Sequence, residues 1–130
     1  MVAPVAVVIV DSPNHRVMHW ICGASHGMIL AGGNGPGSGL HQLKIPRGVA
    51  VDIDGAVMVA DSQNHRVVRW THGSDVGELV AGGNRGGNGL DQLQFPRCVV
   101  IARDGAVIVA DTINHRIVRW VRGATIGTVI

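Results

Sequence analysis

Histidine is the residue of this 130-residue chain best suited to chemistry, because it recurs within one motif at three places. Each of these histidines follows an asparagine and precedes an arginine, with an aspartate upstream and a tryptophan downstream. A neutral imidazole can act as a general base or ligate a metal, and three copies could converge on one ion. The motif residues are Asp11, Asn14, His15, Arg16, Trp20, Asp61, Asn64, His65, Arg66, Trp70, Asp111, Asn114, His115, Arg116 and Trp120.

The motif belongs to an internal repeat with a spacing of 50 residues. About half of the residues of 46–80 recur unchanged at 96–130, and most of the others are replaced by a side chain of the same class. Val67, for example, becomes Ile117, and Ser62 becomes Thr112. A fixed period of this length indicates an array of similar supersecondary units.

Each unit has the pattern of four short β-strands. In the second unit we expect strands at 47–52, 56–60, 65–71 and 78–81, with Asp54-Gly55 in a hairpin turn. Apolar residues fill nearly every position of 56–60, which is typical of a sheet covered on both faces. No segment has a helical period. The sequence therefore predicts an all-β fold, a β-propeller of four-stranded antiparallel blades.

Three motifs of the second unit resemble the NHL repeat. They are Asp-x-x-Asn-His-Arg-Val at 61–67, the Gly-rich loop 82–89, and Gln-Leu-x-x-Pro-Arg at 92–97. Partial copies on either side extend the likeness over essentially the whole chain, with a departure at Cys98, where the preceding unit has Gly48. Propellers of this kind close as six-bladed discs, so the resemblance implies that about three blades, half of a disc, are present.

The repeat register predicts one array over 1–130, with blades at 1–45, 46–95 and 96–130. Because Val5 aligns with Gly55, the first blade is expected to lack its inner strand, which leaves eleven strands. The apolar faces of the two outer blades would then be bare. Two interpretations stay open: the chain belongs to a longer propeller, or two copies form a homodimer that closes a six-bladed ring.

This geometry argues against a shared metal site. Copies of the motif lie about one blade apart around a ring, so they cannot meet at a point off its axis. We expect a structural role, in which Asp61 caps the turn and pairs with Arg66. Asn64 would take the unfavourable backbone conformation, and His65 would pack or hydrogen-bond between blades. No catalytic residue, metal ligand or cofactor is predicted.

Two other features of the repeat also favour structure over binding. The tryptophans end the third strand of every blade, which favours inter-blade packing over a stacking platform for bases. The glycine-rich stretches 32–37 and 82–87 lack the strand-to-helix context and the Lys-Ser/Thr of phosphate-binding loops, so we expect them to link blades.

The candidate binding residues are arginines at the channel mouth or at positions that vary between blades. Arg47 and Arg97 stand at the start of the innermost strands. The positions of Arg69, Arg119 and Arg122 hold a different residue type in at least one other repeat, and Arg85 occurs in one linking loop only. Together they could face RNA phosphates or acidic protein segments, and a solvated rim is the alternative. The set is Arg47, Arg69, Arg85, Arg97, Arg119 and Arg122.

A rigid disc with variable loops suits a protein-interaction scaffold, and the NHL domains resembled here act in this way. Some of them bind RNA, which is the alternative, although a net charge of +2 gives it little support. Similar propeller hydrolases and lyases hold a metal with inner-strand ligands, whereas the inner strands here offer one carboxylate, Asp52. We therefore predict a non-enzymatic module with a protein partner.

The cysteines and the N-terminus bear on location. Cys22 and Cys98 occupy non-equivalent positions and do not form a disulfide framework. The apolar stretch 1–10 lacks a basic leader and a cleavage site and is too short to span a bilayer, so a strand is expected there. No membrane partner is predicted, and the lack of a signal peptide and of a disulfide pattern favours the cytoplasm.

Overall fold

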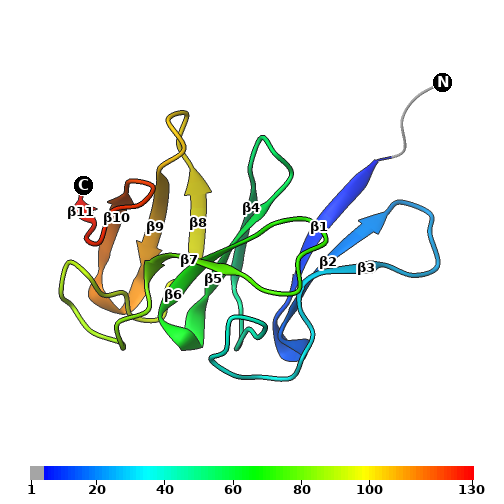
Figure 1. The fold of residues 1–130 in the computed structure, drawn as a ribbon, viewed down its shortest axis with the longest axis horizontal. Helices are drawn as coiled ribbons and strands as arrows, with labels where there is room; N and C mark the ends of the chain where they lie inside the picture. Colours follow the sequence, from blue (N-terminus) through cyan, green and yellow to red (C-terminus); the bar gives the residue numbers. More distant parts are fainter. Residues whose placement is uncertain (1–4) are drawn as a thin grey trace.

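The computed structural model describes residues 5–130, which form three antiparallel sheets lying side by side like the blades of a fan (Figure 1). Blade 1 consists of β1 (Ala6–Asp11), β2 (Arg16–Ile21) and β3 (Met28–Gly32). Blade 2 consists of β4 (Gly48–Val51), β5 (Val57–Asp61), β6 (Arg66–Trp70) and β7 (Glu78–Gly82). Blade 3 consists of β8 (Cys98–Ile101), β9 (Val107–Asp111), β10 (Arg116–Trp120) and β11 (Thr128–Val129). Residues 1–4, where the first strand and blade were predicted to begin, lie outside the described residues.

Each blade is a meander in which neighbouring strands follow one another in the chain. The predicted all-β propeller architecture is confirmed, and every strand of blade 2 begins and ends within one residue of its expected bounds. Residues 5–130 contain eleven strands, of which blade 1 has three. The innermost strands β4 and β8 contact each other, so blades 2 and 3 converge at their inner edges.

The Asp-to-Asn turn of each blade is one turn of 3-10 helix: η1 (Ser12–Asn14), η2 (Ser62–Asn64) and η3 (Thr112–Asn114). The left-handed residue is His65, with φ of 54°, because its N–H bonds back to the carbonyl of Ser62 and closes the turn. The prediction that Asn64 takes this conformation was therefore wrong. The predicted cap was also wrong, since the Asp61 side chain makes no capping hydrogen bond to the turn. No helix among residues 5–130 is long and apolar enough to cross a membrane.

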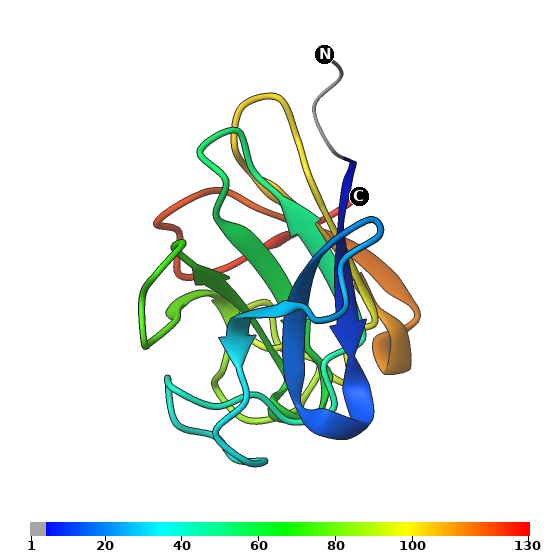
Figure 2. The ribbon, with the colours of Figure 1, turned by 90° about the vertical axis from the view of Figure 1, so that its right-hand side faces the viewer.

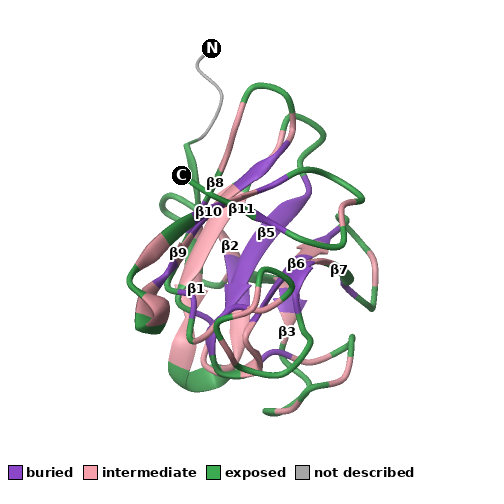
Figure 3. Ribbon diagram, turned by 90° about the vertical axis from the view of Figure 1, so that its left-hand side faces the viewer, coloured by how far each residue is buried: buried purple, intermediate pink, exposed green. Residues whose placement is uncertain are grey.

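The hydrophobic core lies between the blades. All five residues of β5 are buried, as predicted for a strand covered on both faces (Figure 3). Trp70 packs in a cluster with Val17 and Leu43 from blade 1 and its linking loop, and Trp120 packs with residues of blade 2. The predicted inter-blade packing of these two tryptophans is therefore confirmed, whereas Trp20 is only half-buried.

Candidate binding site

Two equivalent hairpins close the inner strands of blades 2 and 3 at the same end: 52–56 between β4 and β5, and 102–106 between β8 and β9. In the first, Asp52 Oδ1 accepts the backbone N–H of Asp54 at 2.8 Å and of Ala56 at 3.0 Å. Gly55 has a φ of 84°, a left-handed conformation that glycine adopts without steric cost. These interactions fix the hairpin with Ile53 at its tip.

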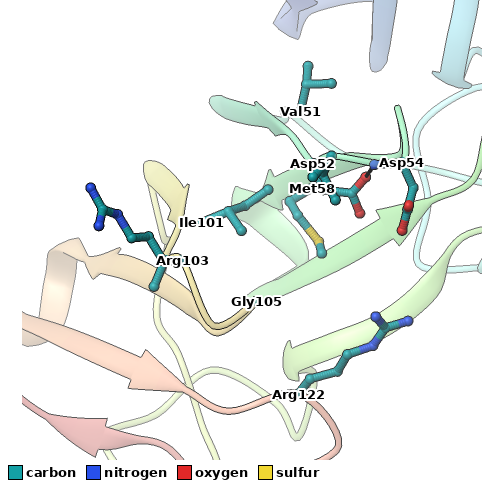
Figure 4. Close-up of a pocket in the computed structure, with 10 residues that line it drawn as sticks. Val51, Asp52, Asp54, Met58, Ile101, Arg103, Gly105 and Arg122 are labelled. Carbon is teal, nitrogen blue, oxygen red and sulfur yellow. Dashed lines mark hydrogen bonds between the residues drawn. The ribbon is translucent and has the colours of Figure 1, made fainter.

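A hollow of about 380 Å³ lies between the two hairpins. Its lining includes Val51 and Ile53 from blade 2, and Ile101 and Arg122 from blade 3. Figure 4 shows Ile101 extending toward Met58, whereas Arg103 points away from both. A second hollow of about 160 Å³ adjoins the first, because Met58 and Arg122 line both. We call these two hollows together the 2–3 groove.

The charged residues of the 2–3 groove differ in whether they have a partner. Arg69 Nη2 lies 3.0 Å from Asp52 Oδ2 and 3.7 Å from Asp54 Oδ2, which neutralises this guanidinium. Arg122 is exposed and makes no ion pair or side-chain hydrogen bond with any other residue of 5–130. Arg103 also lines the groove without an ionic partner among residues 5–130, but it points away from Met58 and Ile101 (Figure 4). The groove therefore has two unneutralised guanidiniums, each of which can donate two parallel hydrogen bonds to a carboxylate or phosphate.

Apolar side chains line the same hollow as Arg122. Ile53 is 101% exposed and Val51 is 51% exposed, while Met58 at 5% lines the hollow beneath them. Ile53 packs against nothing that would explain an isoleucine at a hairpin tip. Arginine and methionine are enriched at protein interfaces, and the core of an interface is more apolar than the rest of the surface.

The corresponding hollow between blades 1 and 2 has different chemistry. It measures about 520 Å³, and its lining includes His19 and His72. In the repeat these two positions correspond to Arg69 and Arg122 of the 2–3 groove. The two inter-blade hollows thus use equivalent positions, and substitutions between repeats give only the 2–3 groove an arginine at both.

The Asp-x-x-Asn-His-Arg motif joins each blade to the adjoining linking loops. In blade 2, Asp61 Oδ2 accepts Arg66 Nε and Asn64 Nδ2, both at 2.8 Å, and Oδ1 accepts the backbone N–H of Lys44 at 2.7 Å. His65 Nδ1 accepts the N–H of Phe95 at 3.1 Å. Burial raises the pKa of Asp61 and lowers the pKa of His65. The predicted Asp61–Arg66 pair and the inter-blade hydrogen bond of His65 are confirmed.

Comparisons with known proteins agree with this geometry. Residues 43–70 and 93–120, in blades 2 and 3, match the family model of the NHL repeat. These two segments of the chain are NHL repeats. No curated protein matches the sequence.

Solved structures contain the same fold. One of them is an auxiliary nutrient binding protein from Bacteroides thetaiotaomicron VPI-5482, with a TM-score of 0.63 and 16% sequence identity. The match covers 86% of this chain and 33% of that chain, so the NHL array spans about a third of the length of that structure. This likeness shows the propeller fold of the NHL array and nothing further about it.

The six arginines predicted as binding residues do not gather at one place on the NHL array. Arg69 and Arg119 are ion-paired, with Asp52 and Asp104. Arg47 and Arg97 are exposed, and they precede β4 and β8 at the ends of these strands that lie away from the hairpins.

The other two arginines of the set lie in loops. Arg85 lies in an exposed linking loop with φ of 66°. Arg122, in the loop between β10 and β11, is the member of the set that lines the 2–3 groove without an ionic partner.

Sequence reasoning missed Ile53, Asp54 and Met58, which line the groove together with Arg122. One signal was present: Ile53 occupies the tip of an Asp-x-Asp-Gly turn, where the next NHL repeat has Arg103. A single exposed isoleucine is common, but together with the exposed Val51 of the same hairpin it forms an apolar surface of the kind that can mark an interaction site. Met58 gave no such signal, because a buried methionine looks like any other core residue.

Proposed function

We propose that this NHL array is a non-enzymatic protein-binding module whose contact surface is the 2–3 groove. The observation that carries the proposal is the pairing of a fully exposed Ile53 with the unpartnered guanidinium of Arg122 around one hollow. A partner segment would place an apolar side chain against Val51 and Ile53 and a carboxylate on Arg122.

The one inner-strand carboxylate is already engaged, which supports a binding role over catalysis. Asp52 accepts two backbone N–H groups of its own hairpin and pairs with Arg69. A carboxylate held in this way serves the hairpin rather than a substrate.

Protein is favoured over RNA because the arginines are divided among different parts of the array. RNA binding gains affinity from several unpaired cations along one phosphate track. Here Arg69 and Arg119 are neutralised by aspartates, and Arg47 lies at the far end of β4.

A displayed library of random peptides tests the proposal. We expect selection against the chain to yield peptides that combine an apolar residue with a carboxylate. Fluorescence anisotropy should show at least tenfold weaker binding of these peptides to Ile53→Asp and to Arg122→Glu. Lys44→Glu is the matched control, because Lys44 is an exposed cation outside the groove and its reversal should leave binding unchanged.

Two outcomes contradict the proposal. If the selected peptides bind both groove variants as tightly as the original chain, the groove is not the contact. If single-stranded RNA binds with a steep salt dependence that Arg122→Glu abolishes, the partner is RNA.

A further inference from the structure

The side of the 2–3 groove that belongs to blade 2 is acidic. Its lining contains three carboxylates, Asp52, Asp54 and Glu78, against one guanidinium, Arg69, so negative charge is in excess. Arg69 is committed to the first of them, because its Nε and Nη2 lie 3.1 and 3.0 Å from Asp52 Oδ2 and its Nη1 donates to Thr71 Oγ1. The side chain of Asp54 lies farther from Arg69, at 3.7 Å, and is 71% exposed.

Glu78 is the carboxylate of this side that has no cation. It lies opposite Arg69 on the neighbouring strand β7, but the guanidinium of Arg69 is turned to the 52–56 hairpin. Glu78 is exposed and makes no ion pair or side-chain hydrogen bond with another residue of 5–130. The equivalent positions of the other blades hold Met28 and Thr128, so a carboxylate here is specific to blade 2.

The side that belongs to blade 3 is basic. It contributes Arg103 and Arg122 to the lining and no carboxylate. In blade 2 the equivalent positions hold Ile53 and His72, so these differences between the repeats add positive charge to blade 3 alone. The hairpins of the two blades project at the same end of the array (Figure 2), and Figure 4 shows Arg122 on a segment apart from the hairpin that carries Asp54. The groove therefore has sides of opposite charge.

The side chains that line both hollows give the groove an order. Arg122 and Met58 lie where the hollows meet, because they line both. The larger hollow has the apolar side chains of Val51 and Ile53, and the smaller one has Glu78. An apolar surface, a guanidinium and a carboxylate therefore follow one another along the groove.

These charges do not neutralise each other across the groove. Among residues 5–130, no ion pair joins Arg103 or Arg122 to a carboxylate of blade 2. A purely acidic segment on Arg122 would meet Glu78 as a like charge, and a purely basic segment on Glu78 would meet Arg122. Complementary charges across an interface fix the register of a partner, and like charges exclude the wrong one.

We propose that the groove recognises a segment of a partner protein in which an apolar, an acidic and a basic side chain occupy successive places. The apolar side chain lies in the larger hollow, the carboxylate binds Arg122 where the hollows meet, and a lysine or arginine binds Glu78 in the smaller hollow. This inference rests on the proposed function of the 2–3 groove, to which it adds the charge order of the partner.

A pair of isomeric peptides tests the order. The first is the tightest peptide selected from the displayed library, which we expect to carry a basic residue on the far side of its acidic residue from the apolar one. In the second, the acidic and basic residues are exchanged, so composition and net charge are the same. Anisotropy should show roughly tenfold or more weaker binding of the second peptide to the original chain, because both charges meet like charges.

Reversing the two charges of the groove should reverse this preference. The double variant Glu78→Lys/Arg122→Glu keeps the net charge of the chain and should bind the exchanged peptide more tightly than the selected one. Asp75→Lys is the matched control, because Asp75 is an exposed carboxylate of the same β6–β7 hairpin that lines neither hollow. It should leave the preference of the original chain unchanged.

Glu78→Gln keeps the test decisive if the double variant does not fold. It removes one exposed charge and should weaken the selected peptide several-fold, and no weakening would overturn the inference. Equal binding of the two isomers to the original chain, or an unreversed preference in a folded double variant, would overturn it as well. If the peptides lose affinity for Ile53→Asp in these cases, the groove is still the contact and only the charge order is wrong. If they bind Ile53→Asp as tightly as the original chain, the proposed function itself fails.

Discussion

His65 Nδ1 accepts a hydrogen bond from the backbone N–H of Phe95, thirty residues further along the chain, at 3.1 Å. The two rings also meet edge to face, with centroids 4.5 Å apart. The same bond joins His15 to Ile45 at 3.0 Å, so a histidine ties each of the first two blades to the loop that follows it. The bond requires an unprotonated Nδ1, which makes the contact of His65 with Phe95 sensitive to acid.

Stability should therefore decrease in mild acid because of His65. Burial lowers the pKa of His65 below its unfolded value, so the unfolded chain binds the proton more readily. The contribution of His65 to the free energy of unfolding is complete above about pH 6.5 and is lost as the pH falls toward the lower folded pKa. Urea unfolding between pH 7.5 and 5 (roughly the range in which histidine titrates) should show a smaller loss in His65→Asn. An identical slope for the two proteins would contradict this account.

Removing the buried guanidinium of blade 2 should destabilise the fold strongly. Arg66→Ala leaves the fully buried Asp61 without its ionic partner and removes three hydrogen bonds to the linking loop. We expect a loss of about 3–5 kcal/mol in the free energy of unfolding by urea. Arg16→Ala is the matched control, since its more exposed pair should cost much less. Equal losses in the two variants would show that covering the motif adds no stability.

Trp70 should contribute more to stability than Trp20. Trp70 is 3% exposed and packs between blades 1 and 2, and its indole N–H donates to the carbonyl of Ser74 at 2.8 Å. Trp70→Ala should cost about 3–5 kcal/mol by calorimetry or urea titration. The half-buried Trp20, with a longer bond of 3.3 Å to Ala24, should cost clearly less when replaced. The reverse order would mean that the blade 1 surface is covered in solution.

Gly77 should not tolerate a side chain. A Cβ at this position would lie 2.8 Å from Trp70 Cε3, and the ring is confined by the core. Gly77→Ala should therefore cost about 1–3 kcal/mol and alter near-ultraviolet circular dichroism from the tryptophan. Gly73→Ala separates this effect from backbone strain, because Gly73 has nothing within 4 Å but a φ of 81°. A loss at Gly73 with none at Gly77 would contradict the packing argument.

Much of the blade architecture is readable from the sequence because its determinants are local. The strands of blade 2 follow from apolar runs bounded by turn residues, and the period of 50 residues follows from direct comparison of the repeats. The Asp61–Arg66 pair was predictable as well, since both residues belong to one turn and the strand after it. The choice of His65 over Asn64 for the left-handed position was not, because hydrogen bonding within the 3-10 turn decides it.

The sequence alone determined that this is an array of four-stranded NHL-type blades, because alternation of strand and turn is encoded within each repeat. Only the tertiary structure decided which charged groups are free. Arg69 and Arg122 look equivalent in the sequence, yet a hairpin aspartate neutralises the first and no residue of 5–130 pairs with the second. The 2–3 groove depends on two hairpins that the packing of β4 against β8 brings together. Such contacts join residues about one blade apart, and a local pattern carries no information about them.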